Sequence, residues 1–218
     1  MKRIAVLALL LLSLVSCSYR FVADMDKKPE DVALILPYSR IYYADGHEIA
    51  YDDSLSALHQ GKIVAALADI DLSVKDTINV VGLPGQEYLD GEIMSLVNVV
   101  PKNLTGARVP PAIASLLKER GDRYGLILFS EGLAWNRKAY SNAVWKGAFL
   151  GVATAILTLG TIALYSIPED EATHIYAMLV DVYSDKVVFF NKVSKSGNPM
   201  KDERVAAALE KLFKKYPR

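Results

Sequence analysis

The three histidines are the side chains of this sequence best suited to bind a metal ion, yet they do not cluster. His47, His59 and His174 lie far apart along the chain, and the single cysteine, Cys17, stands near the amino terminus. Zinc sites draw most of their ligands from positions only a few residues apart. We therefore expect no metal site and no cofactor.

Two groups of acidic residues could supply paired carboxylates, which can act together as a general acid and a general base. Asp69 and Asp71 are two positions apart, and acidic residues 169–171 follow Pro168. Both groups stand beside breaks in the apolar pattern, so we interpret them as solvated turns or caps. The sequence contains no G-x-S-x-G, P-loop or G-x-G-x-x-G motif. We expect a protein that is not an enzyme and has no catalytic residues.

The composition favours a folded protein with a core of its own. The chain has 218 residues, 52% of them hydrophobic and 23% charged, and its 25 basic and 25 acidic side chains balance. This excludes a disordered chain. A balanced charge also gives no basic field that would attract nucleic acid, so we expect no nucleic-acid partner.

The first residues have the features of a secretory signal peptide. Two basic residues, Lys2 and Arg3, precede nine unbroken apolar residues at 4–12, and small residues lead to Cys17. Nine residues rise only about 14 Å as a helix, roughly half the hydrocarbon core of a bilayer. The segment is therefore too short for a permanent span, and we assign residues 1–16 to a signal peptide.

The tetrapeptide Leu14-Val15-Ser16-Cys17 resembles the lipobox of bacterial lipoproteins. The resemblance implies cleavage before Cys17, a thioether-linked diacylglycerol on its sulfur and an amide-linked fatty acid such as palmitate. Several acyl chains anchor a protein durably. Ser18 stands where an Asp would retain the lipoproteins of enteric bacteria in the inner membrane, which implies the outer membrane and a periplasmic domain. The alternative is a lone cysteine behind an ordinary signal, although Cys17 has no partner for a disulfide.

The remaining chain predicts an α/β fold (α+β layered), with a mixed sheet and helices packed on it. Residues 17–30 have mixed charge and little periodicity, as expected of a lipidated tether. Residues 31–218 then form a single α/β domain. The first expected elements are a buried strand closed by Pro37, a tyrosine-rich hairpin over 40–51 that turns at Asp45-Gly46, and a helix capped by Asp53 or Ser54.

The second half of the domain repeats this alternation. Residues 78–82 predict a weak strand, and an apolar patch follows at 93–100. Two prolines at 110 and 111 open a helix that ends near Arg120, with Gly121 in the cap region. We then expect a strand over 124–130, a hairpin over 174–190, and a terminal helix whose apolar stripe runs from Val205 to Tyr216.

An apolar insert separates the strand at 124–130 from the hairpin at 174–190. Residues 147–167 are 21 consecutive uncharged residues, long enough to span a bilayer. Three interpretations are open: a single membrane span, a re-entrant or interfacial element, and a helical hairpin buried against the domain or a sister subunit. If the flanking strands pair in one sheet, the insert must leave and return on the same side. We favour this excursion.

The order of these elements is similar to that of periplasmic lipoproteins with a TolB-amino-terminal-like domain. The similarity rests on the helix leading into 122–130, on the strands at 178–183 and 186–189, and on the terminal helix. It covers roughly residues 31–216 and consists of apolar patterns, so it implies a fold and an envelope location and transfers no functional residue.

Together these features predict a membrane-anchored lipoprotein of the cell envelope that acts as a non-enzymatic scaffold or regulatory subunit. Its expected partners are the membrane, through lipid on Cys17 and through residues 147–167, and another envelope protein or sister subunits. The alternative is an oligomeric, membrane-inserting component of a secretion system or pore.

Overall fold

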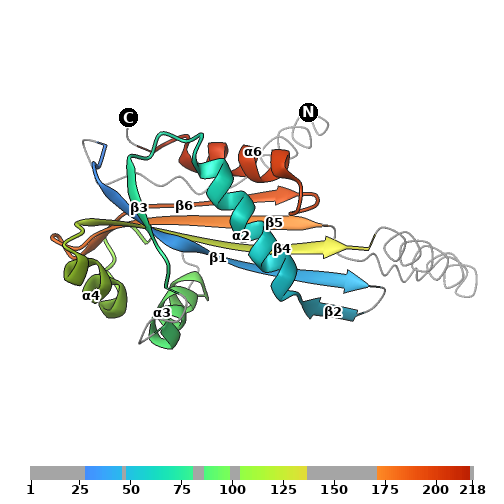
Figure 1. The fold of residues 1–218 in the computed structure, drawn as a ribbon, viewed down its shortest axis with the longest axis horizontal. Coiled ribbons are helices and arrows are strands. Elements are labelled where there is room, and N and C mark those ends of the chain that lie inside the picture. The colour runs from blue at the N-terminus through green and yellow to red at the C-terminus, as the bar shows by residue number, and fades with distance from the viewer. Residues whose placement is uncertain (1–27, 46–47, 81–85, 99–103, 137–170, 217–218) are drawn as a thin grey trace, which may run out of the picture.

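A six-stranded mixed sheet forms the centre of the protein (Figure 1). The computed structural model describes residues 28–45, 48–80, 86–98, 104–136 and 171–216. Along the sheet the order is β2-β1-β4-β5-β6, and β3 pairs with β1. The strands are β1 (Val32–Asp45), β2 (Glu48–Tyr51), β3 (Val74–Ile78), β4 (Tyr124–Trp135), β5 (Ala172–Asp181) and β6 (Lys186–Ser196).

The two longest strands, β1 and β4, run parallel, and β4, β5 and β6 are joined by antiparallel pairing. In the described part of the chain, four helices cover the two faces: α2 (Asp53–Leu67) and α6 (Asp202–Phe213) lie on one face, and α3 (Gln86–Asn98) and α4 (Pro111–Arg120) lie on the other (Figure 1). These features confirm the predicted fold class, a mixed sheet with helices packed on it.

The central strands are apolar on both faces because helices cover both. In β4, Leu126 and Leu128 pack into the core beneath α2 and α6, whereas Ile127 and Phe129 pack into the core beneath α3 and α4. All four are at most 3% exposed. A sheet buried on both sides requires continuous apolar runs rather than alternation, which is why residues 124–129 read as one unbroken strand.

Local sequence sets the ends of the helices. Asp52 caps α2, since its side chain accepts a hydrogen bond of 2.9 Å from the backbone of Leu55, one residue before the predicted caps. Pro111 begins α4, and Gly121 ends it with a φ of +73°, a conformation that favours glycine. Both ends of α4 match the sequence prediction.

Two strand boundaries differ from prediction. The first strand continues through Pro37 to Asp45, because the proline lies at a bulge where β1 needs no backbone N–H. The strand predicted at 78–82 lies four residues earlier, as β3 at Val74–Ile78. Its polar residues fit a short strand that pairs over only a few positions. The hairpin is confirmed by the pairing of Asp45 with Glu48, and its turn at 46–47 lies outside the described residues.

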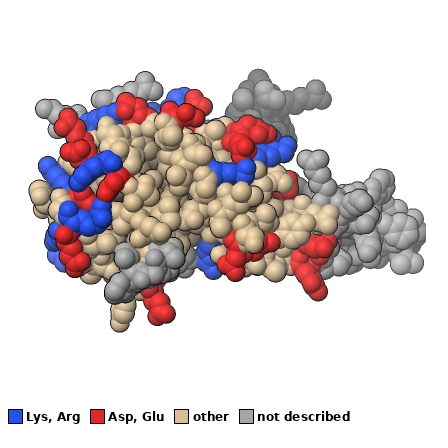
Figure 2. Space-filling model, in the orientation of Figure 1, with Lys and Arg blue, Asp and Glu red and all other residues tan. Residues whose placement is uncertain are grey.

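Charged side chains of both signs gather at the end of the sheet where β1 begins (Figure 2). The buried carboxylate of Asp122 accepts hydrogen bonds of 3.0 Å from both Lys75 Nζ and Arg120 Nε, and Arg120 also pairs with Asp76. Burial alone would raise the pKa of Asp122, but the hydrogen bonds from its two basic neighbours outweigh burial and lower it.

The strands that flank the apolar insert pair with each other. β4 and β5 are antiparallel from Tyr124 opposite Asp181 to Leu133 opposite Ala172. The chain therefore leaves β4 and enters β5 at the same end of the sheet, which confirms the predicted pairing. The insert itself, residues 147–167, lies outside the described residues. None of the helices described here is long and apolar enough to cross a bilayer.

Candidate functional site

An interruption in strand pairing along the outer edge of β1 creates the candidate site. β4 occupies one side of β1 along most of its length. On the other side, β3 pairs with Val32–Ile35 and β2 pairs with Tyr42–Asp45. Residues 36–41 between them have no strand partner on this edge among the described residues. The bulge between Ile35 and Tyr38, with Pro37 inside it, marks the beginning of the gap.

Side chains of α2 replace part of the missing strand. The backbone N–H of Ile41 donates to Ser56 Oγ at 2.8 Å, and its carbonyl accepts from the backbone N–H of Asp52 at 2.9 Å. The amide of Gln60 donates to the carbonyl of Pro37. The first half of α2 thus satisfies backbone groups at both ends of the gap.

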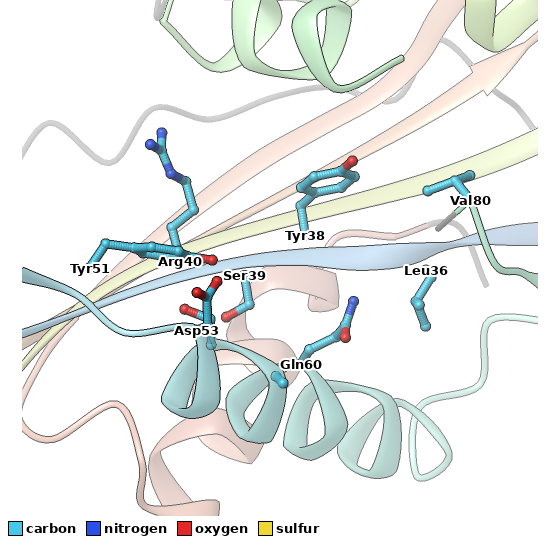
Figure 3. Close-up of a pocket in the computed structure, with 10 residues that line it drawn as sticks. Leu36, Tyr38, Ser39, Arg40, Tyr51, Asp53, Gln60 and Val80 are labelled. Carbon is cyan, nitrogen blue, oxygen red and sulfur yellow. The ribbon is translucent and has the colours of Figure 1, made fainter. Parts of the chain in front are cut away.

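A hollow of about 460 Å³ opens between these two ends. Figure 3 shows Ser39, Asp53 and Gln60 on the α2 side of β1, with Tyr38 and Arg40 on the opposite side. Its volume lies within the range of ligand pockets in proteins. Ten residues line it: Leu36, Tyr38, Ser39, Arg40, Tyr51, Asp53, Ser56, Ala57, Gln60 and Val80.

Three polar side chains form a cluster that reaches this hollow through one of its members, Ser39. Nδ1 of His59 lies 2.9 Å from the hydroxyl of Ser39 and 3.2 Å from the hydroxyl of Ser130, and the two hydroxyl oxygens are 3.1 Å apart. His59 and Ser130 are fully buried, whereas Ser39 is partly exposed and lines the hollow. Ser39 therefore links the buried cluster to solvent.

His59 is held in its neutral form. Burial, with a smaller contribution from the positive charge of Lys62, lowers the pKa of His59 to about 4. Its Nε2 atom is buried and has no hydrogen-bond partner among the residues that the structure describes. A general base works best with a pKa near the working pH and within reach of substrate. This imidazole has neither property, so the cluster serves to fix Ser39 and α2 against the sheet.

A second, smaller hollow of about 280 Å³ lies at the far end of the sheet, where β4 ends and β5 begins. His174 lines it with Glu131 and Tyr42, and its Nδ1 is 2.8 Å from Ser194 Oγ. Burial and the positive charge of Lys192 lower the pKa of His174, against an opposing effect of Glu131. His59 and His174 thus belong to separate sites.

The residues singled out from the sequence do not converge on one site. Cys17 lies outside the described residues. Asp69 and Asp71 are exposed in the turn after α2, where Asp71 pairs with Lys28. Of the acidic residues at 169–171, Glu171 is described, and it ties the end of β4 to β6 by accepting hydrogen bonds from Trp135 N at 3.2 Å and Asn198 Nδ2 at 2.8 Å.

Sequence reasoning named His59 only as one of three isolated histidines, and it missed Ser39 and Ser56. The buried residues of α2 are Ser56, His59, Ile63 and Leu67, which follow helical spacing. A helix stripe that is apolar in one half and polar in the other needs polar partners on the sheet. The helical spacing of Ser56 and His59 with two apolar residues could have revealed the site from the sequence, because it predicts that His59 contacts a polar side chain of the neighbouring strand.

Comparisons with known proteins find remote likenesses to solved structures. No family model matches it, and no curated protein is similar in sequence. The chain is similar to a PelC dodecamer from Paraburkholderia phytofirmans, with 8% identity, a TM-score of 0.41 and coverage of 91% of this chain and 95% of the other.

Two further structures resemble the chain at a similar distance. Lipoprotein GNA1162 from Neisseria meningitidis is 9% identical with a TM-score of 0.35, covering 85% of this chain and 96% of the other. The LpoB C-terminal domain from Salmonella enterica is 12% identical with a TM-score of 0.31, covering 80% and 88%. At this distance no residue or activity is transferred from them.

Proposed function

We propose that this protein is a lipid-anchored subunit of the bacterial cell envelope, held in the outer membrane through Cys17 and facing the periplasm. Its α/β domain acts without catalysis, as a scaffold or regulator that binds another envelope protein. The motif Leu14-Val15-Ser16-Cys17 supports the anchor.

One observation supports the proposal most: the two segments that we propose to contact membrane, the tether and the apolar insert, join the sheet at opposite ends. The tether joins the domain at Val32, beside Tyr124 of β4. The chain that contains the apolar insert leaves and returns at the other end, beside Leu133 and Ala172. We infer that 147–167 is an excursion that contacts lipid or a subunit neighbour while both flanking strands stay in the periplasm.

The lengths of the tether and the sheet allow both attachments to use one bilayer. From Tyr124 to Leu133 the sheet extends about 30 Å at roughly 3.3 Å per residue. The tether from Cys17 to Val32 can reach about 50 Å when fully extended. Because the tether is longer than the sheet, the lipid on Cys17 and the apolar insert can enter the same membrane, with the domain lying over it.

We place the partner-binding surface at the edge of β1 and on β2. All four residues of β2 are exposed, and two of them are large and hydrophobic: Ile49 is 57% exposed and Tyr51 is 48% exposed. Tyr51 also lines the hollow and packs edge-on against Tyr42, with ring centroids 6.1 Å apart. Exposed aromatic residues beside a hollow are typical of protein-binding surfaces.

Chemical crosslinking in intact cells tests this function. We expect the tagged, membrane-bound protein to crosslink to a different envelope protein, and the Cys17→Ala variant, released from the membrane, to lose that product. A ladder of identical subunits with no foreign protein would support the oligomeric, membrane-inserting alternative instead. Crosslinks that do not depend on membrane attachment would contradict the anchored role.

A further inference from the structure

We propose that the hollow at the edge of β1 binds an extended peptide of a partner protein, which pairs with the main chain of Ser39 and places a Lys or Arg side chain beside Asp53. The inference rests on the proposed function and specifies the chemistry of the partner. It follows from the backbone, the dimensions and the charge of the hollow.

The backbone of β1 offers one free residue to a visiting strand. Successive residues of a strand direct their N–H and C=O groups to alternate sides. Because Ile41 bonds to α2 on the outer side, Ser39, two residues earlier, also directs its main-chain groups outward. Pro37 has no N–H, and its carbonyl is occupied by Gln60. No described residue forms a strand-pairing or side-chain hydrogen bond with the main-chain N–H or C=O group of Ser39 on this edge of β1.

The gap at the edge of β1 is closed at both ends by β3 and β2, so it can accept a short peptide but not a long strand of another sheet. Pairing with β3 ends at Ile35 and pairing with β2 begins at Tyr42. The open positions from 36 to 40 extend about 17 Å at roughly 3.3 Å per residue. Addition of a strand to a sheet edge derives affinity from main-chain hydrogen bonds and specificity from flanking pockets. The hollow of about 460 Å³ provides such a pocket beside Ser39.

The charge around the hollow favours a basic peptide. Arg40 also lines the hollow, but Figure 3 shows it on the side of β1 opposite Asp53. The chain that follows it, residues 41–61, contains four acidic residues, Asp45, Glu48, Asp52 and Asp53, and no Lys or Arg. Acidic atoms gather over β2 and the start of α2 (Figure 2). Asp52 is engaged as the cap of α2, whereas Asp53 is exposed and lines the hollow.

An aromatic side chain adds to the recognition surface for a cation. Tyr51 lines the same hollow as Asp53 and precedes it by two residues. An aromatic ring attracts a Lys or Arg side chain to its face, and a nearby carboxylate adds to that attraction. A peptide with a basic residue is therefore expected to bind better than an acidic or neutral peptide of equal length.

The experiment uses the full mature protein in detergent and a displayed library of linear peptides. We expect enrichment of peptides that contain Lys or Arg. Ala57→Trp fills the hollow from an exposed position of α2, and Ala65→Trp places the same side chain two turns later on that helix, away from the hollow. Selected peptides should bind Ala57→Trp about tenfold or more weakly and bind Ala65→Trp like the wild type.

Amide hydrogen exchange supplies a measurement that depends on no variant. A selected peptide should slow exchange at the amide of Ser39, because that N–H gains a hydrogen bond. Asp53→Asn should weaken binding and reduce its dependence on salt.

Several results would overturn the inference: a library without enrichment, equal binding to Ala57→Trp and wild type, or an unchanged Ser39 amide. A dimer in sedimentation experiments that Ala57→Trp abolishes would assign the hollow to a second copy and also overturn it. If the hollow fails these tests while crosslinks to another envelope protein persist in cells, the proposed function stands and the partner binds elsewhere.

Discussion

The buried imidazole of His59 should make the stability of this protein depend on pH in a defined window. Its pKa is about 4 in the folded protein, compared with 6.5 for an ordinary histidine. The unfolded chain therefore binds a proton at a pH where the folded chain does not. The free energy of unfolding must then fall as the pH drops below 6.5, and this fall must level off near pH 4.

The size of the effect follows from the two pKa values. Between pH 7 and pH 5, protonation of His59 in the unfolded state alone should lower the free energy of unfolding by about 2 kcal/mol. Over the whole window the loss approaches about 3 kcal/mol. The lowered pKa of Asp122 and of Asp181 contributes chiefly below the ordinary value of 3.8, outside this range.

Urea unfolding of the mature protein at pH 7, 6 and 5 measures this dependence. His59→Gln should remove about 2 kcal/mol of the difference between pH 7 and pH 5, even if the variant is less stable at every pH. His174→Gln is the matched control, because His174 is only partly buried and the variant should retain most of the difference. Equal slopes for wild type and His59→Gln would refute the assignment of a neutral, buried imidazole.

Three further predictions concern packing, charge and topology. Gly125→Ala should lower the free energy of unfolding by about 1–3 kcal/mol in urea, because the new Cβ atom would lie 2.5 Å from the buried side chain of Leu117 in α4. Gly61→Ala is the matched control: its Cβ atom would lie in open space on α2, and it should raise the free energy of unfolding by about 0.5–1 kcal/mol. Asp122→Asn should cost about 1–3 kcal/mol at pH 7, and the difference from wild type should shrink as the pH falls below 3.8, since the folded-state pKa is lowered. Cysteines at the exposed positions Ser115 and Ser184, one on each side of the apolar insert, should react equally with an impermeant thiol reagent from the periplasm; labelling of one alone would contradict the excursion.

The sequence predicted the fold where the pattern was set by burial. Strand β4 was recognisable from its continuous apolar run. Helix α4 was recognisable from the proline at its start and the glycine at its end, which are both local signals. The pairing of β4 with β5 was also predictable, since both strands are apolar on both sides and flank the same insert. Strand β3 was predicted at the wrong position because most of its residues are polar and exposed, so the local sequence lacks the apolar run of a buried strand. Only the tertiary fold shows that these residues pair with β1.

The candidate site was less predictable from the sequence, since it depends on a stretch of β1 that has no strand partner on one edge. No local pattern shows that β2 and β3 both pair with β1 and leave residues 36–41 between them. Pro37, which first suggested the end of a strand, instead marks the bulge at the beginning of the gap. His59 and Ser39 are twenty positions apart, and their contact appears only when α2 packs across β1.

The anchor at Cys17 is the foundation of the proposed function, and intact-mass spectrometry of the protein purified from membranes tests it directly. We predict a mature chain that begins at Cys17 and carries the added mass of a diacylglycerol and one further acyl chain, with Cys17→Ala yielding uncleaved or soluble protein. A chain cleaved elsewhere, or an unmodified Cys17, would contradict the account.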